Sequence, residues 1–565
     1  MGEPCREVLT LQLGHYANFV GAHWWNLQDT VLSLPGEKVD HELCSDVLFR
    51  RGVTLKGLET YTPRLIALDL KGSLCSLREE GCLYEDLDAT SSVPAWKGGL
   101  TRHQEEPPGE KPPLADLGHQ SPRQERFARV PDAGDRGKRR GTEQNVSVWS
   151  DFLQLNLHPR SLCVVTEYNH EGETDGLESF GRGEALLRDS RYVAEIEDRL
   201  HFFTEECDYL QGFQILCDLH NGFSGVGARM VELLQDEYPG RGLLTWGTCP
   251  VDSGDTDLRK GLFRLMNTIM GIVQMAGHSS LFCPLTLNSN LGRRPGPPAS
   301  FPHLLYDTRL QYHSSAVLAL ALDTVTAPYR LPSSHLSMAG LAENLNFCGR
   351  KVSSVSVSLP FPIGPDSCLP DALLPYMTSP PWTSLSACGN GGSSSGARCF
   401  SQSVVLRGVS KQRQISHGPA GVKQRSALQS LATGEEVLQH YVNSAFPGAV
   451  SAVNLLQQPA RLGPSFPPFF SSSITKEGFT RSEPSREPPG VDSVPVLSAL
   501  QTSTALHHTL RSLYEEIRRV DVRRCSSFFS AGVEEDAFQE TLQELKSLSQ
   551  CYSSTTGGDE SDEEG

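Results

Sequence analysis

The sequence predicts an α/β protein with a parallel sheet, because strand-like segments alternate with amphipathic helical segments along the chain. A first strand over Glu7–Leu13 ends at Gly14, and a helix follows over 17–32, where apolar residues recur at spacings of three and four. The segment 65–70 is almost continuously apolar, as strands buried on both faces of a parallel sheet are. We therefore expect this segment to be an interior strand.

A second strand–glycine–helix junction follows further along the chain. Residues 192–206 have the periodicity of a helix, 209–219 are strand-like, 220–227 form a turn with three glycines, and a helix runs from 228 to about 237. A helix N-terminus offers unpaired N–H groups, and glycine lets that backbone approach an anion closely. Glycine also serves the geometry of a tight turn, so the spacing leaves phosphate binding and simple turn geometry both open.

The last part of the chain predicts two helices with one apolar face each. The first covers 506–520, with Ser503 or Thr504 as its N-cap, and the second covers 538–548. Such stripes predict surfaces that face a core. The stretches 364–398 and 463–494 are rich in Pro and Ser and are interpreted as loops.

Two segments have the composition of disordered chain. The stretch 98–145 is rich in Pro, Gly, Arg and Glu and is interpreted as a disordered insertion, and 553–565 is interpreted as a disordered acidic tail. At 565 residues the whole chain is long enough for more than one domain.

Composition excludes several classes of function. The net charge of −17 provides no surplus of Lys and Arg to meet phosphates, so nucleic acid is not an expected partner. Fifteen cysteines without a C-x-x-C pair indicate reduced thiols of a cytosolic protein. The N-terminus lacks the apolar core of a secretory signal, and the longest apolar stretch, 316–322, is far shorter than the roughly 20 residues that span a bilayer. We expect no transmembrane segment, and any work at a membrane is expected from its surface.

Several segments resemble tubulins, and they occur in the tubulin order. Residues 6–25 resemble the opening strand, loop and helix of tubulins, and 61–70 resemble the second strand. Residues 207–214 match the segment before the tubulin phosphate loop, and 237–241 match the end of the helix after that loop. The closing helices and the acidic tail also resemble the tubulin C-terminus. Several ordered matches over most of the chain are far more specific than one glycine motif.

Within this group the chain is similar to the misato family, a divergent branch of the tubulin and FtsZ-like proteins. The similarity is carried by the doubled Trp24-Trp25, by 149–153, 328–331 and 358–362, and by the charged insertion before Trp149. It implies a tubulin-like fold. The implied units are a Rossmann-like nucleotide-binding-type domain from 1–97 and 146–330, an α+β intermediate domain over 331–495, and a C-terminal helical segment over 496–552.

The resemblance also places a degenerate nucleotide pocket. The matching positions are Gly14, His15, Asn18, Asp69, Gly222, Ser224, Gly225, Gly227 and Tyr329. Departures from tubulin weaken the pocket: Lys71 stands where a carboxylate assists magnesium, and Ser333 or Ser334 stands where an Asn reads guanine. Magnesium requires oxygen donors, which a charged lysine lacks.

Hydrolysis is not expected from this pocket. Tubulins use an acid that follows a Leu-Asn pair, and the residues after Leu345-Asn346 here are Phe-Cys-Gly-Arg. Loss of a positioned acid or base costs about 10²- to 10⁴-fold in rate. We therefore expect no catalytic residue and no metal site, and GTP or GDP is the one cofactor that the resemblance leaves open.

The family resemblance implies a cellular role that residue patterns cannot give. It predicts a non-enzymatic factor that regulates mitochondrial distribution, morphology and fusion, located in the cytoplasm and peripherally on the mitochondrial outer membrane, where a protein partner recruits it. Two alternatives stay open: a GTP-hydrolysing cytoskeletal protein that assembles with tubulin-like subunits, and a scaffold or chaperone for such subunits.

Overall fold

The computed structural model describes residues 6–33, 42–53, 57, 59–74, 77, 146–170, 176–251, 257–332, 336–388, 397–416, 426–485, 490–521 and 525–553. The predicted insertion 98–145 lies outside these residues, and so do Ser333, Ser334 and all but the first residue of the predicted tail 553–565.

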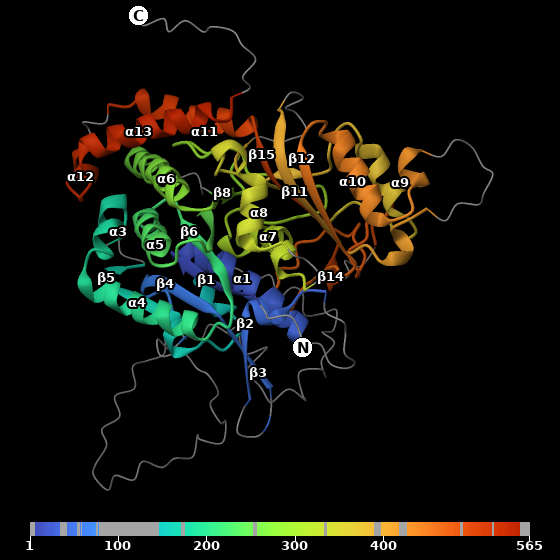
Figure 1. Cartoon of the computed structure of the whole chain (residues 1–565), viewed down its shortest axis with the longest axis horizontal. Helices are drawn as coiled ribbons and strands as arrows, with labels where there is room; N and C mark the ends of the chain where they lie inside the picture. The colour runs from blue at the N-terminus through green and yellow to red at the C-terminus, as the bar shows by residue number, and fades with distance from the viewer. Residues whose placement is uncertain are drawn as a thin grey trace, which may run out of the picture.

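The first sheet has six parallel strands in the order β5-β4-β1-β6-β7-β8 (Figure 1). Their bounds are β1 Glu7–Leu13, β4 Leu65–Lys71, β5 Leu162–Asn169, β6 Leu210–Asp218, β7 Gly242–Cys249 and β8 Leu281–Thr286. Strand β4 lies between β5 and β1 and is buried from Leu65 to Leu70, which confirms the prediction of an interior parallel strand.

Helices cover both faces of this sheet. Alternate residues of β1 belong to different cores: Leu9 and Leu11 pack with helices on one face, whereas Val8 packs with helices on the other. The helices of the first face are α3 (Phe180–Leu186), α4 (Ser190–Glu205), α5 (Phe223–Glu237) and α6 (Leu258–His278), with α11 (Ala505–Arg518) and α13 (Glu535–Gln550) packed over α6. The helices of the second face are α1 (His15–Leu32) and α7 (Gln311–Val325).

A second, mixed sheet follows in the order β10-β9-β15-β11-β12. Its strands are β9 Ser354–Ser358, β10 Thr383–Ser384, β11 Cys399–Arg407, β12 Val450–Leu456 and β15 Val496–Ser503, and α10 (Gly434–Ala445) packs on β12. Short elements complete the chain: α8 (Met338–Leu345), α9 (Leu369–Leu373), α12 (Ser526–Phe529), and the strand pairs β2 (Phe49–Val53) with β3 (Glu59–Pro63) and β13 (Ala460–Arg461) with β14 (Ser493–Val494).

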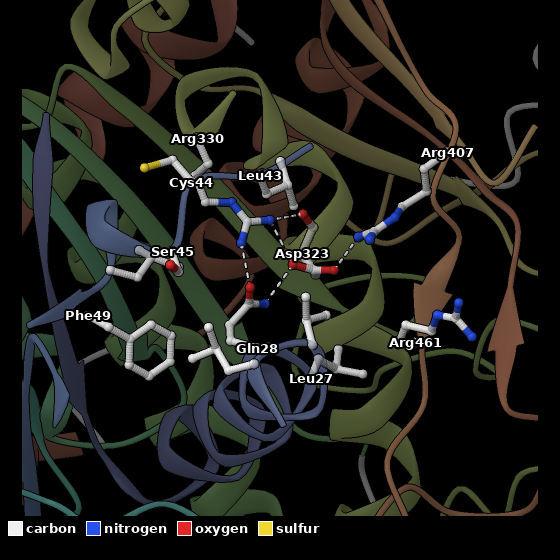
Figure 2. Close-up of a pocket in the computed structure, with 13 residues that line it drawn as sticks. Leu27, Gln28, Leu43, Cys44, Ser45, Phe49, Asp323, Arg330, Arg407 and Arg461 are labelled. Atoms are coloured by element: carbon white, nitrogen blue, oxygen red, sulfur yellow. Dashed lines mark hydrogen bonds and ion pairs between the residues drawn. The ribbon is translucent and has the colours of Figure 1, made fainter. Parts of the chain in front are cut away.

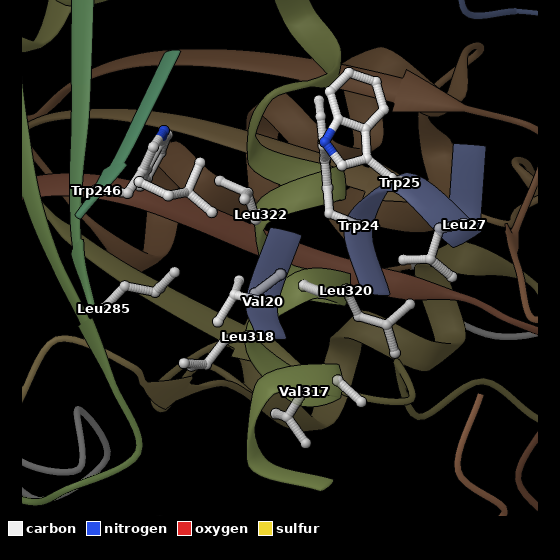
Figure 3. Packing of buried hydrophobic residues seen from close by; sticks show 14 of the residues in the cluster. Val20, Trp24, Trp25, Leu27, Trp246, Leu285, Val317, Leu318, Leu320 and Leu322 are labelled. Atoms are coloured by element: carbon white, nitrogen blue, oxygen red, sulfur yellow. The ribbon is translucent and has the colours of Figure 1, made fainter. Parts of the chain in front are cut away.

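Helix α7 lies between the two sheets and is buried all round. Every residue from Tyr312 to Val325 is buried, and the helix packs against α1 on one side and against β15, β11 and β9 on the other. Its centre is the seven-residue apolar stretch 316–322. Figure 3 shows Leu318, Leu320 and Leu322 of α7 among Val20 and Trp24 of α1. The apolar run therefore serves the interior of a globular fold.

The structure differs from the predictions at the start of α5, at the start of the C-terminal segment and in the role of Thr504. Helix α5 begins at Phe223, five residues before the predicted start, because backbone bonds from Ser224 and Gly225 already close its first turn. The predicted helical segment 496–552 begins with the strand β15, which pairs with β9 and β11. Thr504 is the N-cap of α11, but its hydroxyl accepts a bond from the Arg398 N–H at 2.9 Å instead of capping the helix.

A buried charge cluster joins α7 to the second sheet (Figure 2). Asp323 near the end of α7 pairs with Arg330 at 2.7 Å and with Arg407 of β11, and the Gln28 amide of α1 donates to it at 2.7 Å. These side chains line a cavity of about 40 Å³ that apolar residues of α1 also face. Burial alone would raise the pKa of Asp323, but the guanidinium groups of Arg407 and Arg330 lower this pKa to about 2.

We expect Asp323→Ala to lower the free energy of unfolding by about 3–5 kcal/mol, because it leaves two guanidinium groups buried without a counter-charge. Denaturant unfolding at pH 7.5 measures the change. The matched control is Asp198→Ala, which removes an exposed partner of Arg160 at 3.0 Å and should cost less than about 1 kcal/mol. Equal effects of the two substitutions would contradict the structural importance of the cluster.

Candidate functional site

The candidate site is the edge of the first sheet where β1, β4 and β6 end. Ligands of open α/β sheets bind at such carboxyl edges, next to the N-termini of the following helices. The fold brings most of the sequence-predicted residues to this edge: Gly14, His15 and Asn18 open α1, Asp69 lies near the end of β4, and Gly222, Ser224, Gly225 and Gly227 open α5.

The carboxylate of Asp69 is engaged by the protein itself. Its Oδ2 accepts bonds from Trp149 Nε1 at 2.8 Å and Asn18 Nδ2 at 3.1 Å, and it lies 3.1 Å from His15 Nδ1. The Leu70 N–H donates to Oδ1 at 2.8 Å. Burial opposes ionisation, but the His15 ring and these donors hold the pKa of Asp69 below its ordinary value. Asp69 is thus a structural anion that orients α1 and the segment around Trp149.

Lys71, the departure from the tubulin pattern nearest to Asp69, is part of this edge. Lys71, two residues after Asp69, is exposed at the end of β4. No group of three or more His, Cys, Asp or Glu side chains in the described part of the chain is arranged to hold a metal ion.

The ring of His15 fills space beside the first turn of α1. It lies against the ring of His170 in a tilted arrangement, with 3.6 Å between the ring centroids, and contacts Phe19 edge-on at 5.2 Å. The His15 side chain is only 11% exposed. Where the resemblance places an approach to phosphates, this edge is therefore packed with aromatic rings.

Asp218, which the sequence analysis missed, occupies the N-terminus of α1. It is the last residue of β6 and is fully buried. Its Oδ1 accepts the Ala17 N–H at 2.8 Å and the Thr248 hydroxyl at 2.9 Å, while Oδ2 accepts the Tyr16 N–H at 3.1 Å. The sequence signal for Asp218 is a carboxylate at the end of an apolar strand, and Asp69 lies similarly near the end of β4. Its partner amides, 201 and 202 residues away, could not be inferred from local pattern.

The N-terminus of α5 is likewise closed by the chain's own acceptors. The Gly222 N–H donates to the Leu177 carbonyl at 2.9 Å, and the Phe223 N–H donates to the Asn221 side chain at 2.9 Å. The next amide, of Ser224, donates to the Asn221 carbonyl at 3.1 Å, and the Ser224 hydroxyl donates to the same carbonyl at 2.8 Å. A phosphate would have to displace these bonds.

The glycines of α5 serve close packing. A Cβ on Gly225 would lie 2.0 Å from the Phe180 carbonyl oxygen, and one on Gly183 of α3 would lie 1.7 Å from the Gly222 carbonyl oxygen. A Cβ on Gly227 would lie 2.3 Å from Cys217 Sγ of β6. The glycines therefore let α3 and β6 approach α5, and the packing accounts for them without a ligand.

Tyr329 is placed away from this edge. Its hydroxyl donates to Gln214 Oε1 at 2.6 Å, and Gln214 lies four residues before the end of β6. The ring is 4% exposed and belongs to the core around α1 and α7. The structure does not bring Tyr329 together with the glycine turns.

The Leu345-Asn346 pair lies at the end of α8. Asn346 is the C-cap of that helix, and Glu343 is exposed on it.

Comparisons with known proteins agree with this architecture. Residues 6–118 match the family model of the Misato Segment II tubulin-like domain, and residues 139–331 match the Tubulin domain. Protein misato homolog 1 of Homo sapiens is 49% identical to the chain, with 99% of each covered. The Mus musculus protein of the same name is 50% identical, with 98% of this chain and 99% of the relative covered. Protein misato of Drosophila melanogaster is 29% identical, with 97% and 98% covered.

The fold and these matches define a divergent tubulin-like protein, with a parallel six-stranded sheet, a second mixed sheet and helices at the C-terminal end. The chain belongs to the misato family.

We expect Gly225→Ala to lower the free energy of unfolding by about 1–3 kcal/mol, because the new Cβ overpacks the contact between α5 and α3. The matched control is Gly277→Ala in α6, where a Cβ would meet nothing within 4 Å. That substitution should be neutral or stabilise the protein by about 0.5–1 kcal/mol. Denaturant midpoints of both variants test the packing role, which would be wrong if Gly225→Ala were harmless.

Proposed function

We propose that the protein is a non-enzymatic, tubulin-like factor that regulates mitochondrial distribution, morphology and fusion from the surface of the outer membrane. One observation carries the non-enzymatic part: the first amides of α1 and α5 donate to groups of the chain itself. The mitochondrial part rests on the resemblance to the misato family.

The contacts at the sheet edge argue against a GTPase cycle. The Asp69 carboxylate is engaged by His15, Asn18 and Trp149, so it is not directed toward a metal-bound phosphate. The segment after Asn346 carries no carboxylate that could act as a positioned acid. A tubulin-like fold without this chemistry still offers rigid surfaces for protein partners.

A protein partner is the proposed means of membrane attachment. No helix in the described part of the chain combines the length and the hydropathy needed to cross a bilayer. The proposed recruiter is a docking protein on the outer membrane, as the resemblance to the misato family implies.

We expect the purified full-length protein to retain no guanine nucleotide and to release no phosphate from GTP with magnesium. Chromatography of the denatured protein detects bound nucleotide, and a phosphate-release assay measures turnover, with purified tubulin as the positive control. Stoichiometric nucleotide together with steady turnover would overturn the non-enzymatic proposal in favour of a GTP-hydrolysing cytoskeletal protein.

We expect alkaline carbonate washing to release the protein from isolated mitochondria, because attachment through a protein partner depends on contacts that high pH disrupts. Immunoblotting of the pellet and supernatant measures the release, and an integral outer-membrane protein should stay in the pellet. Retention through the alkaline wash would contradict recruitment by a peripheral contact.

A further inference from the structure

We propose that Asp218 is a built-in anion that occupies the N-terminus of α1 and keeps the phosphate groups of a nucleotide away from this edge of the sheet. The inference rests on the proposed non-enzymatic function and deepens it, because it names the residue that closes the site.

The contacts of Asp218 are those that a bound anion would make. A helix N-terminus binds anions through its first unpaired N–H groups and the positive end of its dipole. In α1 the N–H groups of Tyr16 and Ala17 donate to the two carboxylate oxygens at 3.1 and 2.8 Å, and the Thr248 hydroxyl adds a third bond at 2.9 Å. A phosphate at this helix would need the same donors.

The Asp218 carboxylate also fills the space beside the backbone of Gly14. Gly14 has a φ of 111°, in the region that favours glycine, and a Cβ built there would lie 2.6 Å from Asp218 Oδ2. The close approach that glycine permits to a ligand is therefore used by a side chain of the protein. An external phosphate has no room beside Gly14 while Asp218 holds this position.

Charge strengthens the exclusion at neutral pH. Burial, with a further contribution from Asp69, raises the pKa of Asp218 to about 6, so that it is ionised at pH 7.5. Burial and the nearby Arg264 lower the pKa of His220 to about 3, so that this imidazole is neutral. Electrostatic interactions join Asp218 to Tyr16 of α1, Asp69 of β4, Cys217 of β6 and Cys249 of β7. Arg264 of α6 and His15 of α1 act on His220, which lies two residues after Asp218. A phosphate would meet the carboxylates of Asp69 and Asp218.

A fall in pH protonates Asp218, which should weaken the exclusion of phosphate and also changes the stability of the folded state. Because the folded pKa of Asp218 lies above the unfolded value of 3.8, its protonation stabilises the folded state as pH falls from about 6 to about 4. This stabilisation is lost again as pH rises through about 6. The pKa of Asp69 is lowered in the folded state, so its effect on stability has the opposite sign. Ionised Asp69 stabilises the folded protein above the ordinary carboxyl pKa of 3.8, and this contribution is lost as the pH falls.

The test uses the full-length chain and inorganic phosphate as the probe. Asp218→Ala removes the carboxylate and leaves room for an external anion at the freed amides. We expect this variant to have a lower Tm than the wild type at pH 7.5, and millimolar phosphate should raise its Tm saturably, by at least about 2 °C more than it raises that of the wild type. Chloride at the same ionic strength should not raise the Tm of Asp218→Ala more than that of the wild type.

Asp218→Asn is the matched control, because it removes the charge but keeps the volume. Because the space beside Gly14 stays filled, the Tm of Asp218→Asn should gain much less from phosphate than the Tm of Asp218→Ala. The response of the wild type measures the general salt effect on stability. If Asp218→Ala does not fold, Asp218→Ser is the second variant, because its hydroxyl can accept one of the two amide bonds.

Two outcomes would remove the inference. One is a folded Asp218→Ala or Asp218→Ser variant whose Tm rises with phosphate by no more than the Tm of Asp218→Asn does. The other is a wild-type chain that responds to phosphate saturably at pH 7.5. Absence of a phosphate effect in the variants, together with absence of GTP turnover in the wild type, would leave the proposed function standing. Turnover by the wild type would overturn the proposed function itself.

Discussion

The burial of α7 between the two sheets is the constraint on which the rest of the structure depends. Because its residues from Tyr312 to Val325 are all buried, every side of the helix must be covered, and α1 and the second sheet provide that cover. A helix of this kind cannot be exposed to water without losing most of its apolar contacts. The charge cluster at Asp323 then fixes how the second sheet is oriented, because a buried carboxylate is tolerated only where its partners meet it.

The same demand for satisfied polar groups shapes the carboxyl edge of the first sheet. The fold places two helix N-termini there, and buried N–H groups need acceptors. This chain supplies Asp218 to α1, and it supplies Leu177 and Asn221 to α5. An edge whose donors are already satisfied does not need a ligand for its stability.

Residues at the positions of the tubulin nucleotide pocket have structural roles of their own in this chain. Gly225 and Gly227 allow α3 and β6 to approach α5, so they remain necessary for packing even where no phosphate is bound. Asp69 likewise serves to hold His15, Asn18 and Trp149. Residues that resemble a site can therefore persist for structural reasons, and membership of the tubulin-like group alone does not indicate GTP hydrolysis.

Local pattern determined the parts of this fold that depend on periodicity. The alternation of strand and helix, the interior position of the strand 65–70 and the apolar faces of the two C-terminal helices are properties of neighbouring residues, so the sequence alone specifies them. Only the tertiary structure decided that Asp218 closes the N-terminus of α1 and that Tyr329 donates to Gln214. The last contact joins residues 115 positions apart, and Asp218 meets amides more than 200 positions away. Such pairings follow from how the sheets and helices pack, which a local pattern does not contain.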